Sequence, residues 1–88
     1  MTDAEIRSLI AQELEYACMT AMRTKQLTPV FLEGRRDIAL AELGMDSLAE
    51  MELCIAIEIN TGVSIVPNDL QAIGSLDRLV DVVRARMP

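Results

Sequence analysis

The sequence contains no histidine and no tryptophan, and its only aromatic residues are Tyr16 and Phe31. Without histidine the commonest general base is missing, so neither a Ser-His-Asp nor a Cys-His catalytic group can form. The Gly-x-Ser-x-Gly pattern that marks a nucleophilic serine is absent as well. We therefore expect no catalytic residues in the chain and no enzyme activity of its own.

Long apolar runs are also missing. None approaches the roughly 18–20 residues that a membrane-spanning helix needs. The first residues show neither the basic head nor the apolar stretch of a secretory signal. Cys18 and Cys54 stand far apart with no Cys or His at metal-ligand spacing, so we interpret them as buried, reduced thiols. These absences predict a cytoplasmic chain with no membrane contact and no metal site.

Basic residues are absent from the middle of the chain, whose net charge is −6 overall. From Asp37 to Asp77 there are eight acids and no Lys or Arg, whereas the flanks hold six acids and all eight basic residues, a net charge of +2. A central negative field argues against nucleic acid and anionic membranes as partners. It favours partners with basic docking surfaces, and the alternative is an acidic face that only confers solubility.

The 88 residues are 51% hydrophobic, enough for one domain over residues 1–88 with a small aliphatic core, which suits packed helices. Thr2 and Glu5 form a capping box that begins the first helix. An apolar stripe then predicts a helix that ends near Thr24: Ile6, Leu9, Ile10, Leu14, Ala17, Cys18, Ala21 and Met22. A connection of about twenty residues follows, unusually long for a compact domain. Six apolar residues are expected to hold it down: Val30, Phe31, Leu32, Ile38, Leu40 and Leu43.

The second helix is predicted to begin at Asp46-Ser47, with Asp46 as its N-cap, and to end at Asn60-Thr61-Gly62. It is apolar on two faces. Leu53, Ala56 and Ile57 form one face, and Leu48, Met51 and Ile55 form the other. A helix that faces a single core needs only one such face, so the second is expected to pack on a neighbour or to meet a partner or ligand.

The remaining segments predict a short helix and a third main helix. Residues 63–66 alternate like a strand but have nothing to pair with, so we interpret them as an extended connection before Pro67. Residues 68–73 form one or two helical turns that Gly74 ends, and Ser75 caps the last helix. The expected fold is all-α, with three main helices, one short helix and a long loop between the first two main helices.

Ser47 is the residue best placed for chemistry. Its hydroxyl is expected at the positive end of a helix, where free N–H groups and the helix dipole favour a phosphate group. Ser47 is therefore suited to carry a phosphodiester. It is not suited to act as a nucleophile, because the sequence places no general base beside it to remove the hydroxyl proton. From these residues alone, the simpler alternative is that Ser47 only begins the helix.

A longer pattern surrounds Ser47 and resembles the signature of the acyl carrier protein family. It consists of Leu43-Gly44-Met45-Asp46-Ser47-Leu48, then Glu52-Leu53, Ala56-Ile57-Glu58 and Gly62-Val63-Ser64-Ile65. The likeness extends from about Asp37 to the end of the chain. The resemblance implies an acyl-carrier-like bundle with 4′-phosphopantetheine attached to Ser47, next to Asp46. A separate magnesium-dependent phosphopantetheinyl transferase would transfer the arm from coenzyme A, and the arm's thiol would hold an acyl group as a thioester.

The resemblance also implies roles for the second helix. Asp46, Glu50, Glu52 and Glu58 would form an acidic face with Leu48 and Met51 at its apolar centre. Partner enzymes with basic docking surfaces would bind there: the transferase, an acyl-loading ligase or acyltransferase, and a ketosynthase or other carrier-dependent enzyme. The chain is expected to act as a monomer. Ile55, Ile57 and Ile59 either line a pocket for the acyl chain or, as we expect, pack in the core.

Three positions depart from carriers of fatty-acid synthesis. Ala49 stands where an acid is usual, Thr61 where a large aromatic is frequent, and Met45 where a small residue is common. These differences favour a specialised carrier of polyketide, lipid or related secondary-metabolite synthesis. An aminoacyl or peptidyl carrier of nonribosomal peptide-type pathways is the first alternative, although that type usually has Gly-Gly-x-Ser at the motif. An unmodified helical adaptor that acts through its acidic face is the second.

Overall fold

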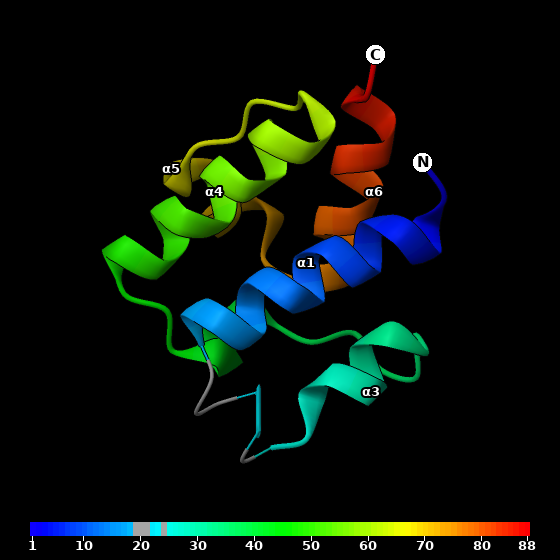
Figure 1. Cartoon of the computed structure of the whole chain (residues 1–88). Coiled ribbons are helices and arrows are strands. Elements are labelled where there is room, and N and C mark those ends of the chain that lie inside the picture. Colours follow the sequence, from blue (N-terminus) through cyan, green and yellow to red (C-terminus); the bar gives the residue numbers. More distant parts are fainter. Residues whose placement is uncertain (19–21, 24) are drawn as a thin grey trace.

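The computed structural model describes residues 1–18, 22–23 and 25–88. Its elements are α1 (Asp3–Ala17), α3 (Leu27–Leu32), the 3-10 helix η1 (Leu40–Leu43), α4 (Ser47–Thr61), α5 (Pro67–Ile73) and α6 (Leu76–Arg86). Figure 1 shows α1 and α4 side by side and running in opposite directions, with α3 on the other side of α1. The prediction of an all-α bundle with three main helices and a short fourth is confirmed, and α3 and η1 are additional short helices within the long connection.

The first helix begins as predicted and ends earlier. The capping box is formed, since the Thr2 amide donates to Glu5 Oε1 at 2.9 Å and the Glu5 amide donates to Thr2 Oγ1 at 3.2 Å. The predicted end near Thr24 is wrong, because Cys18 leaves the helical conformation and α1 ends at Ala17. Cys18 and Met22 are both buried, so the apolar pattern reflects burial on both sides of the break rather than one continuous helix. Ala21 and Thr24 themselves lie outside the described residues.

Side chains of the long connection hold it against the bundle. Four of the six expected anchors are buried: Phe31, Ile38, Leu40 and Leu43. Val30 packs partly against the core, whereas Leu32 is exposed and the prediction for it was wrong. Leu32 adjoins the buried Phe31 on the short helix α3, and a helix this short presents only one face to the core.

Backbone hydrogen bonds join this connection to the last two helices. Ala39 and Ser75 form an isolated antiparallel bridge, in which the Leu40 amide donates to the Gly74 carbonyl and the Leu76 amide to the Ile38 carbonyl, both at 2.9 Å. The start of η1 and the residues just before it are therefore fixed to the junction of α5 and α6. This attachment positions the turn that leads into α4.

The second half of the chain follows the sequence prediction. Gly62 ends α4 with a φ of 76°, a left-handed conformation that glycine adopts without strain. Residues 63–66 belong to no helix or strand, and Val66 has an extended backbone. α5 ends at Gly74, and the Ser75 hydroxyl accepts a hydrogen bond from the Arg78 amide as the N-cap of α6. None of the described helices is long and apolar enough to cross a membrane.

Candidate functional site

The turn before α4 sets the direction in which Ser47 points. Gly44 ends η1 in the left-handed region, with a φ of 61°, and Met45 packs partly against the core. Asp46 is the predicted N-cap, and its Oδ1 accepts a hydrogen bond from the Ala49 amide at 2.8 Å. The buried η1 before the turn and the capped helix after it therefore fix the backbone on both sides of Ser47.

Ser47 is the first residue of α4, and its side chain is exposed. At this position the hydroxyl lies beside the positive end of the helix dipole, where a phosphate group is stabilised. The Asp46 carboxylate is already used by the Ala49 amide. The geometry thus suits Ser47 to an attached phosphodiester, and the chain has no histidine to activate the hydroxyl from within.

An apolar stripe is exposed along α4. Leu48, Met51, Ile55 and Ile59 follow one another at helical spacing, and their side chains are between 47% and 77% exposed. The opposite face, which includes Leu53 and Ile57, is buried. The predicted second apolar face is therefore present and unpacked. Of the three isoleucines expected in the core, only Ile57 lies there, and Ile59 extends the exposed stripe by a further turn.

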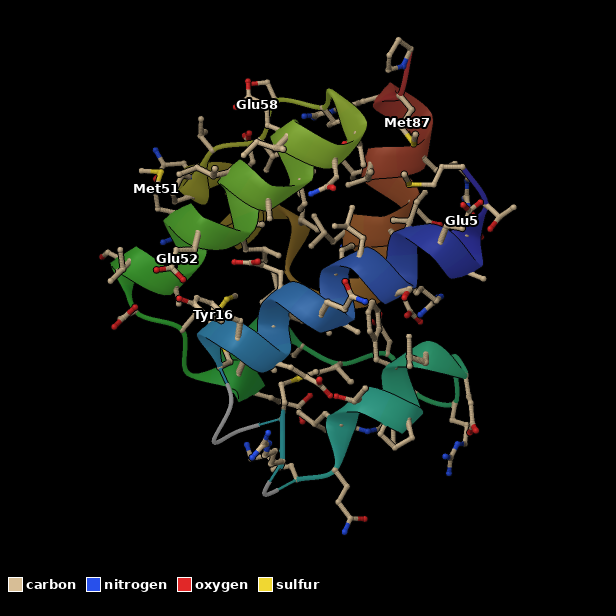
Figure 2. All side chains as sticks on the ribbon, in the orientation of Figure 1. Glu5, Tyr16, Met51, Glu52, Glu58 and Met87 are labelled. Atoms are coloured by element: carbon tan, nitrogen blue, oxygen red, sulfur yellow. The ribbon has the colours of Figure 1, made fainter. Side chains whose placement is uncertain are left out.

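The acids of α4 do not all share this face. At about 100° per residue, Glu52 and Glu58 lie on opposite sides of the stripe, whereas Glu50 is turned about 200° away from Leu48. In Figure 2, Met51 and Glu58 project from the outer side of α4, and Glu52 projects toward the end of α1 that carries Tyr16. The expectation that Glu50 belongs to the same acidic face is wrong, because Glu50 lines a pocket on another side of the helix.

Glu52 approaches a second carboxylate on α1. Burial raises the pKa of Glu13 above its ordinary value of 4.5, and the negative charge of Glu52 raises it further. The folded state therefore disfavours the ionised form of Glu13. Both thiols are buried and free as predicted, and burial likewise raises the pKa of Cys18 and Cys54.

The raised pKa of Glu13 predicts a pH-dependent loss of stability. Since the folded state holds this proton more tightly than the unfolded chain, stability falls as the pH rises through 4.5 and the raised folded value. We expect Glu13→Gln to be more stable than the wild type at neutral pH, with the difference shrinking below pH 4.5. Urea unfolding of both proteins, above and below pH 4.5, measures this difference in stability. Glu58→Gln is the control for the lost charge, because Glu58 is exposed and belongs to none of the ion pairs in the described residues. A Glu13→Gln variant no more stable than wild type at neutral pH contradicts the assignment.

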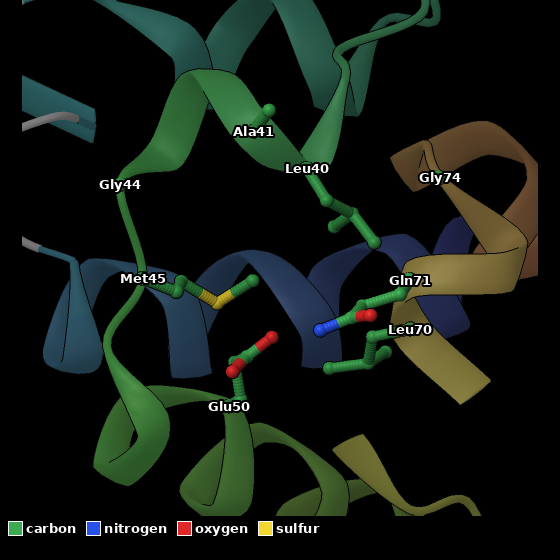
Figure 3. A pocket seen from close by; sticks show the side chains of 8 residues that line it. All are labelled: Leu40, Ala41, Gly44, Met45, Glu50, Leu70, Gln71 and Gly74. Carbon is green, nitrogen blue, oxygen red and sulfur yellow. The ribbon is translucent and has the colours of Figure 1, made fainter. Parts of the chain in front are cut away.

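A pocket of about 340 Å³ lies between η1, the start of α4 and α5. Leu40, Ala41, Gly44 and Met45 line it from η1 and the following turn, Glu50 from α4, and Leu70, Gln71 and Gly74 from the end of α5. Figure 3 shows the side chains of Met45, Glu50, Leu70 and Gln71 converging on the same space. No sequence pattern indicates this pocket. Its residues come from three separate segments, and no local pattern links Gln71 to Glu50.

The comparisons with known proteins identify one family. The family model described as "Phosphopantetheine attachment site" matches residues 32–83, more than half of the chain, and this range contains η1, Asp46, Ser47 and all of α4 and α5. No curated protein and no solved structure matches the chain.

Proposed function

The chain belongs to the carrier proteins of the acyl carrier type, which hold 4′-phosphopantetheine covalently, and from that premise we propose that Ser47 is its attachment residue. The observation that carries the proposal is the position of an exposed serine hydroxyl at the N-terminus of α4, inside the matched range. A phosphodiester there faces the positive end of the helix dipole. Asp46 supports the site by capping the helix through its own carboxylate.

The proposed role is transport rather than catalysis. Carrier domains of this family are non-catalytic in general, and the chain has no histidine to serve as a general base. Once attached, the arm would supply a terminal thiol able to hold an acyl group as a thioester until a partner enzyme takes the cargo. Ser47 contributes only the oxygen of the phosphodiester, which a phosphopantetheinyl transferase forms from coenzyme A.

The direct test is incubation of the purified chain with coenzyme A, Mg²⁺ and several phosphopantetheinyl transferases of broad specificity. We expect intact-mass spectrometry to show a gain of one phosphopantetheine arm and no more. A chain that gains no mass with any of them contradicts the proposal. In that case the better account is an unmodified adaptor. The Ser47→Ala variant of such an adaptor would bind its partner as well as the wild type does.

We further propose that the cargo is an acyl group of polyketide, lipid or related secondary-metabolite synthesis. The support is the segment Leu43-Gly44-Met45-Asp46-Ser47, since peptidyl carriers usually have Gly-Gly-x-Ser instead. An acyl-loading ligase or acyltransferase would load the arm, and a ketosynthase or similar enzyme would use the cargo. An aminoacyl or peptidyl carrier is the alternative, and the activated acids that the native loading enzyme accepts distinguish the two.

The exposed apolar stripe and its two flanking acids are proposed as the docking surface for these enzymes. Leu48 and Met51 offer apolar contact near Ser47, while Glu52 and Glu58 present negative charge on either side. Charges at the rim of an interface mainly raise the association rate and select the partner. Such a surface suits a carrier that must dock, deliver its cargo and dissociate.

Charge reversal tests this surface. We expect Glu52→Lys to lower kcat/KM for arm transfer by about tenfold at low salt, because the attraction that steers association is replaced by repulsion. The loss should shrink as ionic strength rises. Glu33→Lys, an equal change of charge on the exposed end of α3, is the control. If both variants lose the same activity, net charge rather than this surface determines docking.

A further inference from the structure

The pocket beside the Gly44 turn combines an apolar wall with a polar edge. Leu40 and Leu70 are almost fully buried and form the wall, whereas Glu50 and Gln71 bring a carboxylate and an amide to the opening (Figure 3). A volume of about 340 Å³ lies near the lower end of small-molecule sites, which typically enclose about 300–1,000 Å³. A few polar groups on an otherwise apolar surface are what fixes the orientation of a small bound group.

The charge at the opening is negative, and no basic side chain in the described part of the chain pairs with it. Glu50 is the only titratable residue among the eight that line the pocket, and none of the ion pairs in the described part of the chain includes it. An ionised carboxylate only accepts hydrogen bonds. The opening therefore favours a group that donates a hydrogen bond, such as a hydroxyl or an ammonium, and repels a second carboxylate.

The pocket also lies within reach of the proposed attachment site. Glu50 follows Ser47 by three residues on α4, and residues at this spacing are neighbours on a helix surface, with about 5–6 Å between their Cβ atoms. Gly44 and Met45, which line the same pocket, directly precede the Asp46-Ser47 pair. An arm that leaves Ser47 can therefore fold back so that its cargo enters the pocket.

We propose that Glu50 and Gln71, at the opening of this pocket, select short acyl cargoes that carry a hydrogen-bond donor. Such groups are favoured over plain alkyl chains, which leave the carboxylate and amide without a partner, and over chains that end in a carboxylate, which Glu50 repels. Leu40 and Met45 offer apolar surface to the carbon chain. This inference rests on the proposed attachment of the arm to Ser47.

The test compares matched cargoes on the whole chain. Arms that carry butyryl, 3-hydroxybutyryl, 3-aminopropanoyl or succinyl groups are attached by a transferase through stable amide linkages, and intact mass confirms each product. Backbone amide NMR signals of Gly44, Leu70, Gln71 and Gly74 are then compared with those of the chain carrying an unloaded arm. We expect clear changes with the hydroxyl and amino cargoes and little change with butyryl or succinyl. One net hydrogen bond corresponds to about a fivefold rise in the pocket-bound population.

Variants of Glu50 separate the two kinds of donor. Glu50→Leu should remove the preference for both cargoes, whereas Glu50→Gln keeps an acceptor and should retain the hydroxyl cargo but lose much of the preference for the ammonium. Gln71→Leu should weaken both. Glu33→Gln is the control, because it removes one charge from an exposed site that does not line the pocket.

The outcomes distinguish this inference from the proposed function. Equal signal changes for butyryl and 3-hydroxybutyryl, or a preference that survives in Glu50→Leu, overturn the selection by Glu50 while the carrier role stands. Changes produced by succinyl alone overturn it as well. If no arm attaches to Ser47 at all, the proposed function fails and this inference falls with it.

Discussion

Replacement of Ser47 by alanine is expected to abolish the addition of the phosphopantetheine arm. The phosphodiester needs a hydroxyl oxygen, and Ser47 is the one serine exposed at the start of α4, directly after the fixed Gly44–Asp46 turn. The variant should fold normally, because Asp46 rather than Ser47 caps the helix. Alanine is also a favourable helix residue. Intact mass after incubation with the transferase should therefore show only the unmodified chain, with an unchanged helical circular dichroism spectrum.

Ser64→Ala is the matched control for this substitution. Ser64 is also exposed, but it lies in the extended connection after α4, with no helix dipole at its hydroxyl. This variant should gain one arm as fully as the wild type does. Modification that persists in Ser47→Ala, or that disappears in Ser64→Ala, would show that the arm is attached elsewhere.

Phe31→Ala is expected to destabilise the protein by about 3–5 kcal/mol, the usual cost of truncating a buried phenylalanine. The Phe31 ring is fully buried, and the Arg7 guanidinium lies 5.1 Å from its centroid. Arg7 also donates to the Phe31 carbonyl at 2.9 Å and pairs with Asp77 at 2.9 Å, so Phe31 lies where α1, α3 and α6 meet. A domain of this size has a total stability of only about 4–13 kcal/mol. Chemical unfolding should therefore show a large shift of the midpoint.

The adjacent Leu32 provides the control for Phe31. Leu32 is 44% exposed on the same short helix, so Leu32→Ala should change the stability by less than about 1 kcal/mol. If Phe31→Ala does not fold, Phe31→Leu should still fold with a smaller loss, because it keeps most of the buried apolar surface. Similar small losses in Phe31→Ala and Leu32→Ala would mean that the long connection does not stabilise the bundle.

Local signals explain how much of the fold could be predicted. Asp46 and Ser75 as N-caps, and Gly62 and Gly74 as helix ends, each act through hydrogen bonds or backbone conformations within a few residues. The exposed stripe on α4 was similarly visible as a second apolar face. Ile59 belongs to it by the same helical spacing, and that signal was present in the sequence.

Other features depend on contacts between distant segments and could not be predicted from local patterns. The break after Ala17 has no glycine or proline to mark it, and both Cys18 and Met22 continue the apolar pattern because both are buried. The charge of Glu50 and its position on α4 suggest a docking residue when only the sequence is considered. Its place in the pocket follows from the way η1 and α5 pack around the start of α4.

The location of the arm is the most direct test of the central claim. After modification by a transferase, the wild-type chain is digested, and every peptide that contains a serine is fragmented in the mass spectrometer. The account predicts that the whole added mass lies on Ser47, with none on Ser8, Ser64 or Ser75. An arm found on any other residue, or no modified peptide at all, contradicts it.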